Sequence, residues 1–189
     1  MSRLSDIALI AQVVATGSHR AFGQLVEAHQ GAVRRFLLRL TAGDGMLADD
    51  LAQETFIHAW QGLKSFRAAS NFETWLLRIA YRVFLDEKRK EGETHPQSLP
   101  AEGSSDWATS SLVTPPQGGS GGGLLRHDLD LALATLSEVE RTCVVLQCVE
   151  GQSIKDIAAI TGLNENTIKS HLLRGKKNLA EYLRKNGYG

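Results

Sequence analysis

A row of polar and basic side chains, with one leucine among them, lies on one side of a helix that the sequence predicts near the C-terminal end. Helical spacing places its members opposite or beside the apolar stripe of that helix: Asn166, Thr167, Lys169, Ser170, Leu173, Arg174 and Lys177. Short polar groups near a helix start can reach base edges, arginine can bind guanine through two hydrogen bonds, and leucine can contact a thymine methyl group. Lysines are suited to phosphates. The row predicts reading of double-stranded DNA, and a solvated basic face is the alternative.

The segment before this row favours DNA reading, because it predicts a helix-turn-helix. Ser153 is typical of an N-cap, and Asp156 completes a capping-box pattern. Gly162 ends the first helix, and Asn164 begins the second directly afterwards. A helix, a short glycine turn and a second helix form the helix-turn-helix layout. The second helix keeps one apolar stripe for the core: Ile168, Leu172, Leu179 and Leu183.

A different mixed face is expected on a helix over residues 48–60, ADDLAQETFIHAW. One side is predicted to be core: Ala48, Ala52, Phe56, Ala59 and, one turn later, Leu63. The other side mixes polar and acidic groups with two large apolar ones: Asp50, Gln53, Glu54, Ile57 and Trp60. A solvated surface does not usually expose large apolar groups, so this face predicts a docking surface for a basic protein partner. A merely solvated acidic face is the alternative.

The same helix also permits an enzymatic interpretation. Asp50, Glu54 and His58 follow one another at one-turn spacing, as metal ligands or an acid–base cluster would. A helical metal site takes further ligands from facing helices, and the N-terminal block offers no second such Glu and His pair. The sequence also lacks a Gly-rich phosphate loop. We therefore expect a protein that is not an enzyme and that holds no cofactor or metal.

An aromatic and basic segment follows, SFRAASNFETWLLRIAYR, which predicts a loop and then a helix. The helix is expected to bury Phe72, Leu76, Ile79, Ala80 and Val83. Rings beside cations suit unpaired nucleic acid, and small loop residues can frame a pocket for a flipped base. The residues predicted to contact single-stranded DNA are Phe66, Arg67, Ala68, Ser70, Asn71, Trp75, Arg78 and Arg82. In the alternative, Phe66 and Trp75 belong to the core.

Composition limits the class of protein. The chain has 189 residues, 42% of them hydrophobic, and a formal net charge of zero, so the placement of charge matters more than its sum. It has no long apolar run, and its start lacks the features of a signal peptide, which predicts a cytoplasmic protein. Cys143 and Cys148 lie in an apolar run without metal-ligand spacing, so we expect two core thiols.

Helical patterns occupy two blocks, residues 4–91 and 125–185, and no long alternating stretch predicts a strand. The predicted fold class is all-α, with two small helical domains over residues 1–92 and 125–189. Residues 93–124 are rich in Gly, Ser and Pro and include GGSGGG, a run that also suits a designed joint. We expect this segment to be a flexible linker.

Four segments together resemble the extracytoplasmic-function (ECF) group of bacterial sigma factors. They are AFGQLVEAHQGAVRRFL, DDLAQETFIHAW, SFRAASNFETWLLRIAYR and, after the linker, LSEVERTCVVLQCVEGQSIKDIAAITGLNENTIKSHLLRGKKNL. Their order and spacing cover both blocks, roughly four-fifths of the chain. The resemblance implies that the first block is a region-two domain and the second a region-four helix-turn-helix domain.

The resemblance also implies partners. Asp50, Gln53, Glu54 and Ile57 would bind the clamp helices of the largest subunit of core RNA polymerase. The FRAASNF loop would capture an extruded base of the minus-ten promoter element, and the row from Lys169 to Arg174 would read the minus-thirty-five element. A membrane-associated anti-sigma factor would cover these surfaces until a signal arrives, while the chain itself does not insert into the membrane.

One position departs from the family pattern. Where the family commonly has an asparagine shortly after the RIA triplet, this chain has Arg82, so a phosphate contact is expected there rather than a base contact. The rival hypothesis is a self-sufficient helix-turn-helix regulator that binds an operator without polymerase. The exposed apolar groups and the aromatic loop favour the sigma-factor interpretation, because a regulator of that kind has no use for single-strand chemistry.

Overall fold

The computed structural model describes residues 3–68, 70–94 and 122–188. All regular structure in these residues is helical, which agrees with the predicted fold class. The elements are α1 (Arg3–Thr16), α2 (His19–Leu40), α3 (Gly45–Gly62), the short 3-10 helix η1 (Leu63–Ser65), α4 (Phe72–Thr94), α5 (Gly122–Ala134), α6 (Glu138–Cys148), α7 (Ile154–Thr161) and α8 (Glu165–Lys185). Most of the predicted linker, including the start of GGSGGG, lies outside the described residues.

Side-chain caps fix where the helices of the second block begin. The Ser153 hydroxyl accepts a hydrogen bond from the backbone N–H of Asp156, and the Asn164 side chain accepts one from Thr167. Between them Gly162 adopts φ 78°, a left-handed conformation that glycine reaches without steric cost. The helix-turn-helix predicted from these residues is confirmed as a local structure.

The first block is a bundle in which α2, α3 and α4 pack on one another and α1 covers α2. The predicted core positions of α3 are buried or half-buried, but Leu51 and Thr55 are buried as well. Thr55 satisfies its hydroxyl by donating to the carbonyl of Leu51 at 2.7 Å. The buried side of α3 is therefore wider than the alanine stripe alone predicted.

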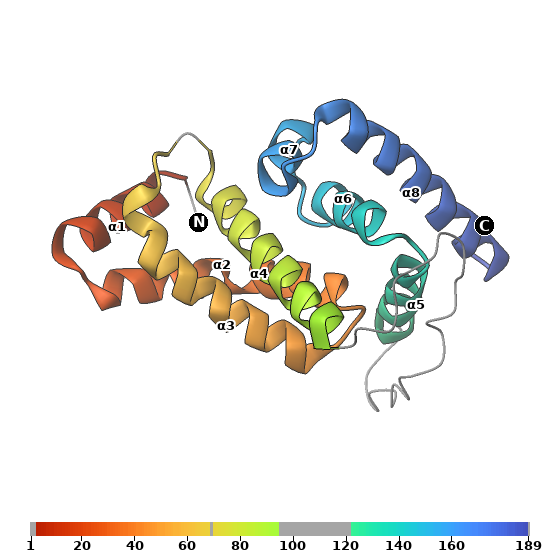
Figure 1. The fold of residues 1–189 in the computed structure, drawn as a ribbon, viewed down its shortest axis with the longest axis horizontal. Helices are drawn as coiled ribbons and strands as arrows, with labels where there is room; N and C mark the ends of the chain where they lie inside the picture. Colours follow the sequence, from red (N-terminus) through yellow and green to blue (C-terminus); the bar gives the residue numbers. More distant parts are fainter. Residues whose placement is uncertain (1–2, 69, 95–121, 189) are drawn as a thin grey trace.

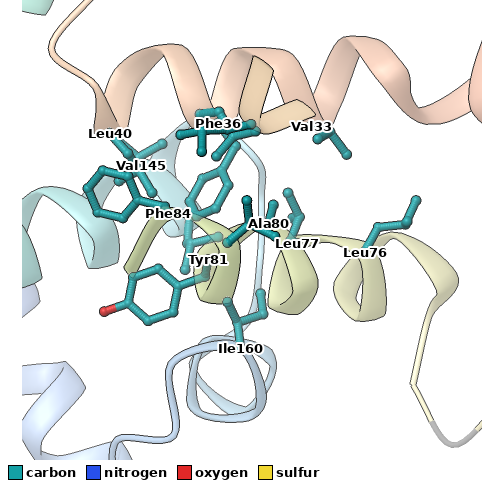
Figure 2. Packing of buried hydrophobic residues seen from close by; sticks show 14 of the residues in the cluster. Val33, Phe36, Leu40, Leu76, Leu77, Ala80, Tyr81, Phe84, Val145 and Ile160 are labelled. Carbon is teal, nitrogen blue, oxygen red and sulfur yellow. The ribbon is translucent and has the colours of Figure 1, made fainter. Parts of the chain in front are cut away.

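Helix α4 is buried on two sides because it lies between the blocks (Figure 1). Of the predicted core residues, Phe72, Leu76, Ala80 and Val83 are buried and Ile79 is half-buried. Leu77, Tyr81 and Phe84 are buried too, although the sequence analysis did not place them in the core. Figure 2 shows Tyr81 beside Ile160 of α7, while Phe84 lies near α2 and Val145 of α6. One buried cluster thus contains residues of both blocks.

Polar contacts also join the blocks. The buried guanidinium of Arg141 on α6 donates to the carbonyl of Leu40 at the end of α2, at 3.3 Å, and to the carbonyls of Leu133 and Ala134 at the end of α5. Thr74 of α4 donates to the Gln152 side chain at 2.9 Å, in the turn before α7. These bonds satisfy groups that would be costly to bury unpaired. The two blocks form one packed unit in this structure.

Two further expectations concern cysteines and membranes. Cys143 is fully buried, as predicted, but Cys148, the last residue of α6, is exposed. The prediction of two core thiols was therefore wrong for Cys148. Within the described part of the chain, none of the helices combines the length and apolarity needed to cross a bilayer.

Candidate nucleic-acid and protein-docking surfaces

The row predicted on the last long helix lies on α8, and most of it faces solvent. Leu173 is 74% exposed, although it is a large apolar residue, and Lys169, Arg174 and Lys177 are exposed beside it. The buried stripe of the same helix runs through Ile168 and Leu172. The row and the stripe therefore separate as the helical spacing predicted.

Hydrogen bonds engage several members of the row at the start of α8. Thr167 is half-buried and its backbone N–H is engaged by Asn164, while the hydroxyl of Ser170 donates to the carbonyl of Asn166 at 3.0 Å. A serine hydroxyl can still accept a hydrogen bond while it donates one. Asn166 and Ser170 are exposed and remain available to DNA, whereas Thr167 presents only part of its side chain.

Arg174 is the member of the row with the most contacts of its own. Its Nε lies 3.5 Å from the carboxylate of Glu140 on α6, and its Nη2 lies 3.3 Å from Nδ1 of His171. Sequence reasoning did not identify Glu140, because it belongs to another helix and no spacing rule links it to α8. Lys177 makes a looser contact with Glu181, at 3.9 Å one turn further on.

The side of α3 that was predicted to dock a partner is largely exposed to solvent, with one exception. Asp50, Gln53 and Ile57 are exposed, and Ile57 keeps 57% of its surface in solvent. Glu54 is half-buried, with Oε1 3.5 Å from Nε2 of His58. Among the described residues, no group of three or more His, Cys, Asp and Glu gathers as a metal site would require.

Trp60 is the exception. Its ring stacks on His19 with centroids 4.6 Å apart and meets the edge of Phe22 at 5.0 Å, so it is half-buried against the start of α2. The expectation of an exposed tryptophan was wrong. A single-helix wheel placed Trp60 outward, but the rings that cover it come from a neighbouring helix.

The loop between η1 and α4 is held by an aromatic cluster, defined here as Phe66, Phe72 and Trp75. The ring centroid of Phe66 lies 5.6 Å from Phe72 and 5.5 Å from Trp75 in edge-on geometries, and Phe72 stacks on Trp75 at 5.6 Å. Phe72 is buried, whereas Phe66 and Trp75 are half-buried. The alternative interpretation, that these rings belong to the core, therefore holds for Phe72 and in part for Phe66 and Trp75, while a contact with single-stranded DNA stays a prediction.

A narrow recess opens beside the aromatic cluster. Its walls are Asp6 and Ile7 of α1, the cluster residues Phe66 and Phe72, and the loop residues Ala68 and Ser70. The walls lie too close for a water molecule to enter, so a base would have to move the loop. Ala68 has φ 53°, a strained conformation for a residue with a Cβ. Sequence reasoning found the loop residues but missed the contribution of α1.

The remaining predicted contacts around this loop fall into two groups. Asn71 accepts a hydrogen bond from the backbone N–H of Glu73 at 3.3 Å and so helps to begin α4. Arg67, Arg78 and Arg82 are exposed, which leaves their guanidinium groups available to phosphates.

A buried histidine underlies the aromatic cluster. His29 of α2 is 4% exposed, with Nε2 3.2 Å from Asp6 and Nδ1 3.8 Å from Glu73, and its ring meets the edge of Phe72. Burial alone would lower the pKa of His29, but the nearby carboxylates of Glu73 and Asp6 outweigh it and raise that pKa. Charged histidine is thus favoured beneath the loop, and the sequence pattern gave no sign of this group.

Comparison with protein families gives a consistent result for both blocks. Residues 25–94 match the model described as Sigma-70 region 2, and residues 126–179 match the model described as Sigma-70, region 4. The chain is 34% identical over 175 residues to the ECF RNA polymerase sigma factor SigE of Mycolicibacterium smegmatis, covering 90% of this chain and 66% of that protein. It is 30% identical to the ECF RNA polymerase sigma-E factor of Haemophilus influenzae, with 93% of each chain covered.

Two solved structures share the fold. The sigma factor RpoE from Bartonella quintana, in complex with the anti-sigma factor NepR, has a TM-score of 0.70 and 31% identity, covering 86% of this chain and 96% of that one. CnrH, in complex with the cytosolic domain of CnrY, has a TM-score of 0.67 and 25% identity, covering 97% and 99%. The similarity extends over both blocks in each case.

Proposed function

The chain belongs to the extracytoplasmic-function group of sigma factors, and from that premise we propose that it binds core RNA polymerase and directs it to promoters with two spaced elements. The observation that carries this proposal is Ile57, a large apolar side chain left 57% exposed between Asp50, Gln53 and Glu54. A mixed surface of this kind is typical of a protein interface. We assign it to the clamp helices of the largest polymerase subunit.

Each block supplies one DNA-reading surface in this proposal. The exposed row on α8 enters the major groove of the minus-thirty-five element, with Asn166, Ser170 and Arg174 on base edges and the lysines on phosphates. The aromatic cluster, with Arg67, Arg78 and Arg82 around it, binds the non-template strand of the minus-ten element after it opens. The polymerase carries out nucleotidyl transfer, and this chain supplies recognition.

Tethering explains why polymerase is needed. Each DNA surface is small, and the zero net charge of the chain gives little general attraction to the phosphate backbone. Joining both surfaces on one polymerase raises the effective concentration of the second once the first has bound. We therefore expect promoter binding by the holoenzyme and only weak binding by the free chain.

We further propose that a membrane-associated anti-sigma factor controls this chain by binding it on the cytoplasmic side. The chain itself stays in the cytoplasm. Support comes from two similar structures: RpoE in complex with the anti-sigma factor NepR, and CnrH in complex with the cytosolic domain of CnrY. The exposed docking face of α3 and the row on α8 are the surfaces that such a partner would have to cover to block polymerase or DNA.

Run-off transcription with core polymerase on a genomic DNA library, with and without the chain, tests the proposal. New start sites that share two spaced upstream motifs are expected. DNA binding by the chain alone, with no polymerase-dependent initiation, would instead favour the helix-turn-helix regulator.

The docking assignment needs its own variant. Ile57→Glu places a charge at the apolar centre of the face and should weaken core-polymerase binding at least tenfold, as for a residue at the centre of an interface. Leu4→Glu is the matched control, because Leu4 is a large apolar residue that is 78% exposed and lies on α1, away from the docking face of α3. Equal affinity of both variants for polymerase would remove α3 from the docking surface.

A further inference from the structure

Helices α6 and α8 approach each other closely at Gly175, one residue after Arg174. A Cβ atom at position 175 would lie 2.8 Å from Cγ2 of Val144, which is buried on α6, and 3.4 Å from Cβ of Glu140. A contact below 3.0 Å would force the two helices apart, so glycine is needed for this spacing. The close approach brings the first turn of α6 directly behind the proposed guanine reader.

Glu140 is held back in the helix interface while Arg174 extends from it. The side chain of Glu140 is 12% exposed and that of Arg174 is 61% exposed, and the carboxylate Oε1 lies 3.5 Å from Nε of the guanidinium. The backbone N–H of Glu140 donates to the N-cap hydroxyl of Ser137, so this turn of α6 is itself anchored. The carboxylate therefore extends from an anchored turn of α6 and lies beside the guanidinium of Arg174.

The atom that Glu140 approaches matters for DNA reading. A guanidinium can bind guanine O6 and N7 with the two terminal nitrogens, and this fork is free when a carboxylate is at Nε. His171 approaches only one terminal nitrogen, Nη2, which carries two hydrogens and keeps one for a base. Glu140 and His171 thus contact Arg174 at Nε and at one terminal nitrogen, and neither of these contacts occupies Nη1.

We infer that Glu140 is a positioning residue that orients Arg174 for a guanine in the upstream promoter element. The inference rests on the proposed reading of that element by α8. A free arginine side chain loses rotamer freedom when it binds, and a carboxylate that has already ordered it lowers that cost for the one geometry that guanine accepts. Arg174 would still contact DNA without Glu140, but as a mobile cation with less preference among bases.

The test measures base preference with holoenzyme made from the full chain and core polymerase, on a promoter library randomised in the upstream element. Arg174→Ala is expected to reduce a guanine preference at one position by roughly fivefold or more. Glu140→Gln, which removes the charge at nearly constant size, should reduce the preference at that same position by about threefold or more, and little further in the Arg174→Ala background. Glu140→Asp, which withdraws the carboxylate by one carbon, should act in the same direction.

Glu138→Gln is the matched control, because Glu138 lies in the same first turn of α6 and is exposed. It should leave base preference unchanged. An equal loss of transcription on every library member with Glu140→Gln, or an unchanged profile in both Glu140 variants while Arg174→Ala flattens one position, would overturn the positioning role and leave the reading of DNA by α8 standing. If Arg174→Ala flattens no position, the proposed guanine contact fails first, and the positioning role fails with it.

Thermal unfolding of each variant separates folding from reading. Glu140 contacts the middle of α8, so substitutions at this position could affect folding. The base preferences of the Glu140 variants are therefore compared only where their unfolding midpoints match that of Glu138→Gln within a few degrees. Where Glu140→Gln falls outside that range, Glu140→Asp supplies the decisive profile, since it keeps the charge in the interface. An unchanged profile of a folded Glu140→Asp would contradict positioning by this carboxylate.

Discussion

In the first block the rings of Phe66, Phe72 and Trp75 pack on one another, whereas in the second block Leu173 and Arg174 extend from α8 into solvent. The proposed minus-ten surface is thus part of the core that supports it, and the recess beside it is closed. The proposed minus-thirty-five surface is formed before DNA arrives. The difference fits the ligands, since a duplex offers a preformed groove while an extruded base has to be admitted.

The largest expected effect tests whether a residue of the proposed minus-ten surface also stabilises the first block. Phe72→Ala removes a buried ring between His29 and the other two members of the aromatic cluster, so the free energy of unfolding should fall by about 3–5 kcal/mol. Leu173→Ala, at the exposed row, should change it by less than about 0.5 kcal/mol. Urea unfolding of both variants measures this contrast, and a similar cost for the two would contradict it.

Arg174→Ala is expected to have a smaller effect that appears in DNA recognition alone. Discrimination at one upstream base pair should fall by about 1–3 kcal/mol if the fork binds guanine, with little change in unfolding. Holoenzyme binding to promoters altered at single upstream positions provides the measurement. Equal loss on scrambled upstream DNA would make Arg174 a phosphate contact and remove the basis for the positioning role of Glu140.

The sequence predicts a surface well where its side chains lie on one helix. It predicts a surface poorly where the side chains depend on contacts with other helices. The α8 row was predictable, because Gly162 and Asn164 fix where α8 begins. Helical spacing then determines which of its residues share a face. Trp60 was misplaced because its partner His19 lies on another helix. Likewise, α4 was assigned one buried side, because nothing in its own spacing shows that α7 covers the other.

The same reason limits prediction of the functional details. Asp6 reaches the recess from α1, and Glu140 reaches Arg174 from α6, so both depend on packing between segments distant in sequence. The fold class and the caps follow from local patterns. The partners of individual site residues depend on tertiary contacts, for which the sequence has no periodic signal.

The stability of the first block should also depend on pH. The change in the free energy of unfolding should be smaller than the change caused by the loss of the buried Phe72 ring. The raised pKa of His29 means that its contribution to stability is fully present below about pH 6.5, the ordinary value for histidine, and is lost as pH rises through the raised folded value. Glu73, whose pKa is lowered first by its contact with His29, contributes stability at pH above its ordinary pKa, and this contribution is lost on acidification. The first block should be most stable between these limits.

Unfolding midpoints measured across neutral and mildly alkaline pH check this effect. The wild-type midpoint should decline as pH rises, and His29→Gln, which cannot titrate, should have a flatter profile at a lower stability. Parallel profiles for the two chains would show that the ion pairs of His29 with Asp6 and Glu73 do not control the pH dependence.

The smallest expected effect concerns Lys177, which lies on α8 three residues after Arg174. Within the described residues, its one ion pair is with Glu181, at 3.9 Å. If it neutralises one phosphate, Lys177→Gln should reduce the slope of log affinity against log salt by about 0.9, with a similar loss on every upstream sequence. Holoenzyme binding over a salt series on matched and scrambled upstream DNA measures both quantities. A loss of affinity that depends on the upstream sequence, with an unchanged slope, would place Lys177 on a base edge. Lys177 would then belong to the base-reading residues of α8 and not to its phosphate-binding residues.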